Sequence, residues 1–271
     1  MCVTRSCYYG YCHRKSNRKE SEVIQKVTTC FNENRRRYGS RRIAIELKIS
    51  REKVRRTMIA EELRAIQPKR FKPKTTDSKH DFRISPNLLK KVEKGSFTKG
   101  EVVVGDITYM RIRGGKFCYF ACFQDKFTRR IVGWQVSQRM TTQLVIDALN
   151  MARRRFLIKK EAIIHTDQGS QYASVEYRRL LYINGFRQSM SRKGNCYDNA
   201  QAESFFSRFK AELLEEGVFE SYEDAKSEVF SYIEGYYNRT RIHSALGKSP
   251  MQFEKELKTK ERRESFVSYQ T

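Results

Sequence analysis

Three carboxylates of this chain lie in sequence contexts that favour metal-assisted chemistry on phosphates. Asp106 interrupts the β-branched run EVVVGDITYM, where an ionised side chain is costly unless a cation or a partner compensates it. Asp167 follows the apolar segment AIIHT and precedes Gln-Gly-Ser, so we expect it at a strand end, where ligands collect in α/β sheets. Glu203 lies where GNCYDNAQAESFFSRFKAEL becomes helical. Carboxylates from two strands and one helix can converge on a site for two divalent ions.

The spacing of these acids is weak evidence by itself, because 31 acidic residues produce similar triplets at many intervals. The alternative for each is a solvated surface charge or a helix cap. Lys210 follows Glu203 by about two helical turns, so both side chains are expected near one helix face. That pair would hold a metal ion and a DNA phosphate side by side, whereas the alternative for Lys210 is an ordinary surface lysine.

The charge balance indicates a polyanionic partner. Lys and Arg number 55 against 31 Asp and Glu, which gives a net charge of +24 over 271 residues. The sequence contains no apolar run of about 18 residues and no apolar signal-peptide core, so we expect no membrane partner and a cytoplasmic protein. Nucleic acid is therefore the expected partner.

Residues 1–63 predict a basic helical domain. Three apolar stripes, separated by the Gly39-Ser40 joint and by Ser50 as a helix cap, predict three short helices of a helix-turn-helix-like, DNA-binding module. A solvated helical hairpin is the alternative. The cations expected to contact DNA are Arg41, Arg42, Arg55 and Arg56.

The chain then changes character twice. Residues 64–100 contain Pro68, Pro73 and Pro86 among many lysines, which predicts a basic linker. Residues 101–253 predict an α/β domain around one mixed sheet. The expected strands are EVVVGDITYMRI, KFCYFACFQD, RRIVGWQVSQ, AIIHTD and RQSMS, and amphipathic helices separate the later ones. Residues 254–271 predict a charged tail, which we expect to fray.

Several of these segments together resemble a known family. GDITYM, DKFTRRIVGW, IHTDQGSQY, SMSRKGNCYDNAQAESFFSRFKAEL and YIEGYYNRTRIHSALGKSP, in this order, are similar to the catalytic domain of bacterial insertion-sequence transposases. More narrowly, the chain resembles the second-frame (OrfB) product of the insertion-sequence-three family over roughly residues 20–253. This resemblance implies a retroviral-integrase-type core with a ribonuclease-H-like fold, a mixed five-stranded sheet flanked by helices and preceded by a small all-α domain.

The resemblance also implies roles for particular residues. Asp106, Asp167 and Glu203 match an acidic triad that binds two Mg²⁺ or Mn²⁺ ions, and Lys210 matches a basic position that contacts DNA near the cut. The implied activity is cleavage and joining of DNA strands at the ends of an insertion sequence. The implied partners are double-stranded DNA, namely the terminal inverted repeats and the target, and the first-frame (OrfA) product, fused or separate. We also expect a homo-oligomer on DNA.

Some positions depart from the family pattern or remain ambiguous. Gly105 and Gln168 stand where many members have Thr and Arg, which affects substrate handling rather than metal binding. Asp125 is interpreted as structural and His165 as a packed or supporting residue. An aromatic and basic cluster contacts either DNA or the last helix; it consists of Tyr236, Tyr237, Asn238, Arg241 and His243. Two other functions stay open, a catalytically silent DNA-binding regulator and a ribonuclease-H-type nuclease.

Overall fold

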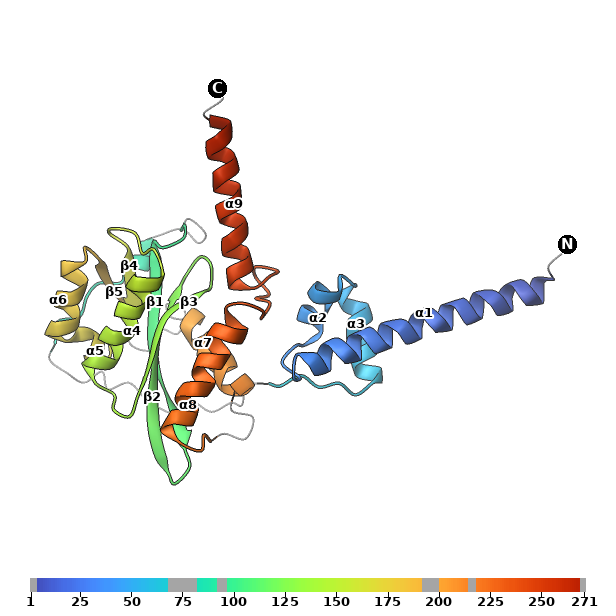
Figure 1. The fold of residues 1–271 in the computed structure, drawn as a ribbon, viewed down its shortest axis with the longest axis horizontal. Helices are drawn as coiled ribbons and strands as arrows, with labels where there is room; N and C mark the ends of the chain where they lie inside the picture. The colour runs from blue at the N-terminus through green and yellow to red at the C-terminus, as the bar shows by residue number, and fades with distance from the viewer. Residues whose placement is uncertain (1–3, 68–81, 92–96, 192–199, 214–217, 269–271) are drawn as a thin grey trace. The chain divides into compact units, whose positions relative to one another are not determined.

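The structure is a computed structural model that describes residues 4–67, 82–91, 97–191, 200–213 and 218–268 (Figure 1). The chain divides into two compact units, residues 1–67 and 68–271, and each is described by itself. Within the described residues, the structure contains no helix with the length and apolar character needed to span a bilayer.

The first unit contains three helices, α1 (Arg5–Glu33), α2 (Ser40–Leu47) and α3 (Arg51–Ala60). The predicted apolar stripes meet in a core that contains Val27, Phe31, Tyr38, Ile43, Val54 and Met58. Ser50 caps α3 as expected, since its hydroxyl accepts a hydrogen bond from the Lys53 amide at 3.3 Å. The helix α1 begins much earlier than the apolar stripe predicted, because Thr4 caps it and no proline interrupts the segment.

The second unit is built on one five-stranded mixed sheet, in the order β3-β2-β1-β4-β5. All five strands predicted from sequence are confirmed: β1 (Val102–Ile112), β2 (Lys116–Asp125), β3 (Ile131–Ser137), β4 (Ile163–Thr166) and β5 (Arg187–Met190). The first three pair antiparallel, whereas β4 and β5 extend the sheet in parallel from β1. The arrangement matches the predicted ribonuclease-H-like fold.

Helices cover both faces of this sheet (Figure 1). On one face lie α4 (Thr142–Arg155), α5 (Ser170–Ala173) and α6 (Val175–Ile183). On the other face lie α7 (Ala200–Leu213), α8 (Tyr222–Phe230) and the π-helical segment η2 (Ser231–Tyr237). The last helix is α9 (Pro250–Ser268), and a short 3-10 turn, η1 (Leu88–Lys91), precedes the sheet. The strand carrying Asp106 therefore lies between two packed helical layers.

Two glycines allow close approach inside this sandwich. A Cβ at Gly133 would lie 2.2 Å from the Ala148 carbonyl oxygen, so the glycine lets α4 pack directly on β3. A Cβ at Gly105 would lie 2.4 Å from Cε1 of Phe123. The ring of Phe123 thus fills the space that a side chain at position 105 would need.

The segments on either side of the predicted core are partly packed against it. Of the expected linker, residues 68–81 and 92–96 lie outside the described residues, but Ser85 and Leu88 hydrogen-bond to Gln188 and Ser189 of β5. The expected fraying of residues 254–271 is wrong up to Ser268, because they continue α9. Glu254 anchors this helix by accepting bonds from Lys99 and Arg130.

Candidate active site

The strand pairing brings the two aspartates to the same level of the sheet. The parallel ladder between β1 and β4 ends with Val104 opposite His165. Asp106 and Asp167 each follow this pair by two residues on neighbouring parallel strands, so they lie at the same level. Asp167 lies just beyond the carboxyl end of β4, whereas Asp106 is within β1 and pairs with Cys122 of β2. Ligand sites of open α/β sheets form at such strand ends.

Backbone amides orient both aspartates. The Ile107 amide donates to Oδ1 of Asp106 at 2.8 Å, and the Gly169 amide, at the start of α5, donates to Oδ1 of Asp167 at 3.0 Å. Both side chains are half-buried. Each aspartate has thus one oxygen held by the backbone, which fixes the direction of its carboxylate.

Glu203 lies in the first turn of α7 and is exposed. Apolar side chains of α7 pack on β2, where the Phe120 ring lies 5.7 Å from Phe206 and 4.9 Å from Phe209 between centroids. This aromatic contact holds α7 against the sheet beside the strand of Asp106, and it leaves Glu203 on the solvent side of the helix.

The three carboxylates influence one another electrostatically. Burial raises the pKa of Asp106 well above its usual range, and the negative charges of Asp167 and Glu203 raise it further. The bond from the Ile107 amide and the positive charge of Lys210 act in the opposite direction. Asp106 is thus the point where the negative potential of the site concentrates, and a bound cation would relieve that repulsion.

Lys210 contacts an aromatic ring as well as the acidic site. Its Nζ lies 4.3 Å from the ring centroid of Tyr109 on β1, which is a cation–π geometry. Burial lowers the pKa of Lys210, and the nearby charge of Asp106 partly opposes that effect. Among the described residues Lys210 is therefore a half-buried cation between Tyr109 and Asp106, unlike an ordinary surface lysine.

The donor atoms suit hard divalent cations, although the described residues contain no group of three or more His, Cys, Asp or Glu side chains placed to hold a metal ion together. Carboxylate oxygens are the ligands that Mg²⁺ and Mn²⁺ prefer. Mg²⁺ usually takes one or two protein carboxylates and completes its shell with water and substrate phosphates. The paired aspartates with Glu203 nearby fit that pattern.

The four arginines predicted to contact DNA lie in the first unit. Arg41 and Arg42 are in α2, where Arg42 lies over the Tyr38 ring at 5.6 Å and donates to the Arg37 carbonyl. Arg55 and Arg56, on exposed α3, both bind Glu52, at 2.9 and 3.0 Å. Glu52 therefore gathers two guanidinium groups on one side of α3.

The structure answers several questions that the sequence left open. Asp125 is structural as interpreted, because it is buried and accepts bonds from the amides of Gly100 and Thr128. His165 is a packed residue whose Nδ1 lies 2.8 Å from the Ser189 hydroxyl. Arg241 is also packed rather than directed to solvent, since it forms a buried ion pair with Glu212.

Sequence reasoning did not single out Tyr109 or Tyr172. Tyr172 is buried in α5, and burial together with the charges of Asp106 and Asp167 raises its pKa well above the usual range. Its hydroxyl makes no hydrogen bond among the described residues. The signal available in the sequence was their spacing from the predicted metal ligands: Tyr109 follows Asp106 by three residues, and Tyr172 follows Asp167 by five.

Models of two integrase core domain families match this chain, over residues 98–196 and residues 203–257. These two ranges include Asp106, Asp167 and Glu203, and they span the described sheet and the helices α4 to α8. The second unit is thus an integrase core domain.

The chain is also similar to whole transposases. It is 37% identical to the transposase InsF for insertion sequence IS3A of Escherichia coli, over 93% of this chain and 90% of that protein. It is 38% identical to the transposase for insertion sequence element IS904 of Lactococcus lactis, over 90% of this chain and 98% of that protein. The chain belongs to the insertion-sequence-three family of transposases, which confirms the family predicted from its motifs.

Solved structures resemble the chain more remotely. The catalytic core domain of HTLV-2 integrase, in complex with magnesium, matches with a TM-score of 0.43 and 17% identity. That match covers 58% of this chain and 97% of the integrase chain.

Proposed function

We propose that this protein cleaves and joins DNA strands at the ends of its insertion sequence by metal-dependent phosphoryl transfer. The observation that carries the proposal is that Asp106 of β1 and Asp167 beyond β4 lie at the same level of neighbouring parallel strands, each oriented by a backbone amide, with the Lys210 cation on the Tyr109 ring of the same strand β1. A cluster of carboxylates with a cation beside it suits a substrate that brings both metal ions and phosphate groups. Membership of a transposase family supplies the class of substrate.

In this proposal Asp106, Asp167 and Glu203 hold two Mg²⁺ or Mn²⁺ ions. When bound, the ions supply activation of the attacking water or 3′-hydroxyl and stabilisation of the leaving oxygen. The chain itself fixes the carboxylates, through the Ile107 and Gly169 amides and through the aromatic packing of α7. Both steps are in-line displacements, so the contribution of the protein is positioning and charge neutralisation.

The direct test is a nicking and strand-transfer assay on a duplex that carries the element end. We expect products with Mg²⁺ or Mn²⁺ and binding without products with Ca²⁺. The assay is run with the chain alone and with the first-frame product, which we propose as its partner, and the assembled species are sized to test the proposed homo-oligomer. Cleavage of an RNA–DNA hybrid in preference to the element end would indicate a ribonuclease-H-type nuclease instead.

Lys210 is proposed to grip a phosphate near the cut. Lys210→Ala is expected to weaken binding of end DNA and lower strand transfer by about tenfold, because the variant cannot form the charge-assisted hydrogen bond to that phosphate. Lys210→Arg should recover part of both effects, since the interaction needs a cation more than a shape.

The measurement for Lys210 is strand-transfer yield against DNA concentration, with Mg²⁺ titrations in parallel. The Mg²⁺ requirement should be nearly unchanged, since the ammonium group is no ligand. Full activity of the alanine variant would contradict the proposed phosphate contact.

The first unit is proposed to supply non-specific DNA affinity through Arg41, Arg42, Arg55 and Arg56. Replacing all four by alanine should flatten the plot of log affinity against log salt, by about one for each phosphate that the variant no longer neutralises. The matched control is Glu52→Gln, which removes the acid between Arg55 and Arg56 and should leave the slope equal or steeper. An unchanged slope in the fourfold variant would show that DNA binds elsewhere.

A further inference from the structure

The hairpin of β1 and β2 extends beyond its neighbours in the sheet. Its ladder runs to Ile112 opposite Lys116, whereas β4 pairs only with Val102 to Val104 and β3 reaches only Tyr119. Among the described residues, the outer part of the hairpin therefore has no further strand on either side, apart from the isolated bridge between Ile112 and Phe219. Along this projecting part, the side chains of one face can be buried while those of the other face are open to solvent.

One face of this projecting part is buried and the other carries aromatic and basic side chains. Met110, Ile112, Cys118 and Phe120 point to the layer of α7 and α8. By the alternation of a strand, the opposite face carries Tyr109, Arg111, Phe117 and Tyr119. The register places Tyr109 opposite Tyr119 and Arg111 opposite Phe117. We call these four residues the outer hairpin face.

The rings of this face are held in place and partly open to solvent. Tyr109 and Phe117 meet edge to face, with centroids 5.4 Å apart and an interplanar angle of 81°. Phe117 is 45% exposed, although a phenylalanine at a hairpin end usually buries more. A ring fixed by a neighbour and open on one side is suited to stacking, since little further ordering is needed.

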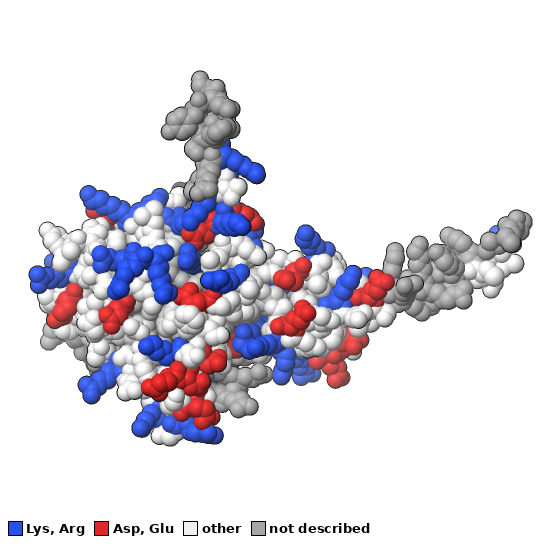
Figure 2. All heavy atoms as spheres, viewed as in Figure 1, with Lys and Arg blue, Asp and Glu red and all other residues white. Residues whose placement is uncertain are grey.

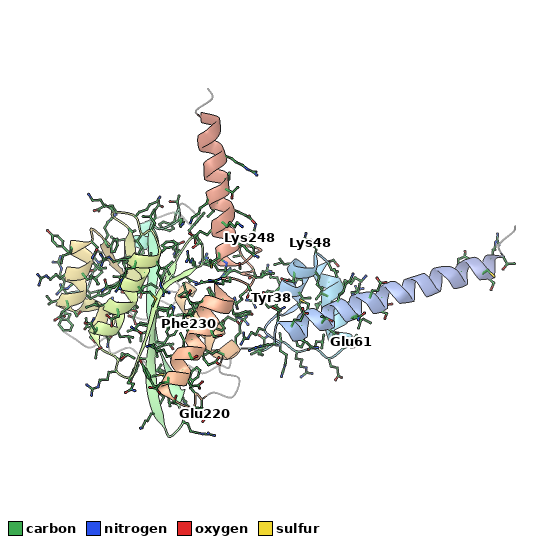
Figure 3. The ribbon with its side chains drawn as sticks, viewed as in Figure 1. Tyr38, Lys48, Glu61, Glu220, Phe230 and Lys248 are labelled. Carbon is green, nitrogen blue, oxygen red and sulfur yellow. The ribbon has the colours of Figure 1, made fainter. Side chains whose placement is uncertain are left out.

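The charges around the outer hairpin face are positive. Lys210 lies on the Tyr109 ring from the α7 side, and Arg111 is exposed and forms no ion pair among the described residues. The other arginine of the hairpin, Arg113, is instead neutralised by Glu220, which lies just before α8 and is labelled in Figure 3. Figure 2 shows basic side chains over much of the visible surface, with acidic ones between them. The face thus combines aromatic rings with the exposed cation of Arg111 and the half-buried cation of Lys210.

The face begins three residues beyond Asp106 along β1, on the other side of the strand, since the alternation puts the Asp106 side chain on the α7 side. Lys210 of α7 connects the two sides by its contact with the Tyr109 ring. Tyr109 follows Asp106 by three residues and Arg111 by five, which correspond to about 10 Å and 17 Å along a strand. A DNA strand advances by roughly 3.4 Å per nucleotide in a duplex and by more when unstacked. The outer hairpin face is therefore within a few nucleotides of the phosphate at Asp106.

We propose that the outer hairpin face binds unpaired nucleotides of the DNA strand that passes the carboxylates, with a base stacked on Phe117 and phosphates held by Arg111 and Lys210. Base–aromatic stacking accepts any base, so this interaction adds affinity for opened DNA without reading sequence. Cations and rings in alternation are the combination that single strands require. The inference depends on the proposed function only in taking DNA as the polymer.

The test is the affinity of the full chain for two DNA probes in Ca²⁺, where no turnover occurs. One probe is a fully paired element-end duplex, and the other has three unpaired bases next to the cleavage position. Phe117→Leu should weaken binding of the unpaired probe by about fivefold or more and change binding of the paired probe little. Phe117→Trp should bind the unpaired probe about as tightly as the unaltered protein does, because an aromatic ring remains available for stacking. Arg111→Ala should lower the salt slope by about one.

The matched controls are Tyr182→Leu and Arg179→Ala on α6, an exposed aromatic and an exposed cation of the same unit. Both should bind the unpaired probe as the unaltered protein does. Equal affinities of Phe117→Leu and the unaltered protein for the unpaired probe would overturn the proposal. An equal loss of affinity for the unpaired probe in Tyr182→Leu would also overturn the proposal. So would a Phe117→Leu variant that changes only oligomer assembly, because the face would then bind a protein partner. Variants of Asp106, Asp167 and Glu203 are assayed for cleavage, whereas the hairpin variants are assayed for binding. The proposed activity and the proposed binding face can therefore fail independently.

Discussion

Replacing Asp167 by asparagine is expected to lower nicking and strand transfer by about 10³-fold or more, because the variant lacks a proposed metal ligand. Asp106→Asn and Glu203→Gln should behave alike. Binding of end DNA in Ca²⁺ should remain close to that of the unaltered protein. The fold should not weaken, since the charge of Asp167 acts against the ionised form of Asp106 and its removal relieves that repulsion.

The measurement is product yield in Mg²⁺, with a thermal melt of each variant. Asp147→Asn on α4 and Glu176→Gln on α6 are the matched controls, since they neutralise acids on other elements and should retain full activity. Near-normal cleavage by Asp167→Asn would refute the two-ion hypothesis. A loss accompanied by a lower melting temperature would mean that Asp167 acts in folding.

The second large effect is expected at Arg241, whose substitution by methionine should destabilise the second unit by about 3–5 kcal/mol. Arg241 and Glu212 are 3% and 2% exposed, and their bidentate contact includes Nε to Oε2 at 2.8 Å. The Tyr232 hydroxyl also donates to Glu212, at 2.8 Å. Without Arg241, the carboxylate of Glu212 would remain buried with its charge uncompensated.

Urea unfolding of the unaltered protein and of three variants measures this effect. The double variant Arg241→Met with Glu212→Leu should regain much of the stability, because no buried charge is left. Arg113→Met, which breaks the exposed pair with Glu220, should cost less than about 1 kcal/mol. Similar losses for Arg241→Met and Arg113→Met would contradict the assigned role of the buried pair.

The strands, and the position of Asp106 and Asp167 on neighbouring strands, could be predicted because their signals are local. The β-branched residues around Asp106 and the apolar run before Asp167 determine two strands, and parallel pairing then places Asp106, within β1, at the level of the end of β4. The relation of Lys210 to Tyr109 could not be predicted, because it joins residues far apart in sequence and depends on how α7 packs across the sheet. The seven-residue spacing predicted that Lys210 lies near the helix face of Glu203, but it contained no information about the contact with the Tyr109 ring.

Two other features lacked a local signal. The π-helical turns of Ser231–Tyr237 follow from tertiary bonds, such as that from the Trp134 indole nitrogen to Glu234 at 3.0 Å. The burial of Arg241 depends on Glu212, which the sequence analysis did not single out. In both cases the deciding partner lies on another element, so periodicity contains no information about it.

The close fit between Gly105 and Phe123 has a consequence for the evolution of this chain. The Phe123 ring fills the volume that a side chain at position 105 would need. A larger residue at position 105 is therefore expected to require a smaller residue at position 123. A lineage that acquires threonine beside the first aspartate must first, or simultaneously, shrink its neighbour on β2. Directed evolution of these two strands should therefore vary residues 105 and 123 together, as a pair.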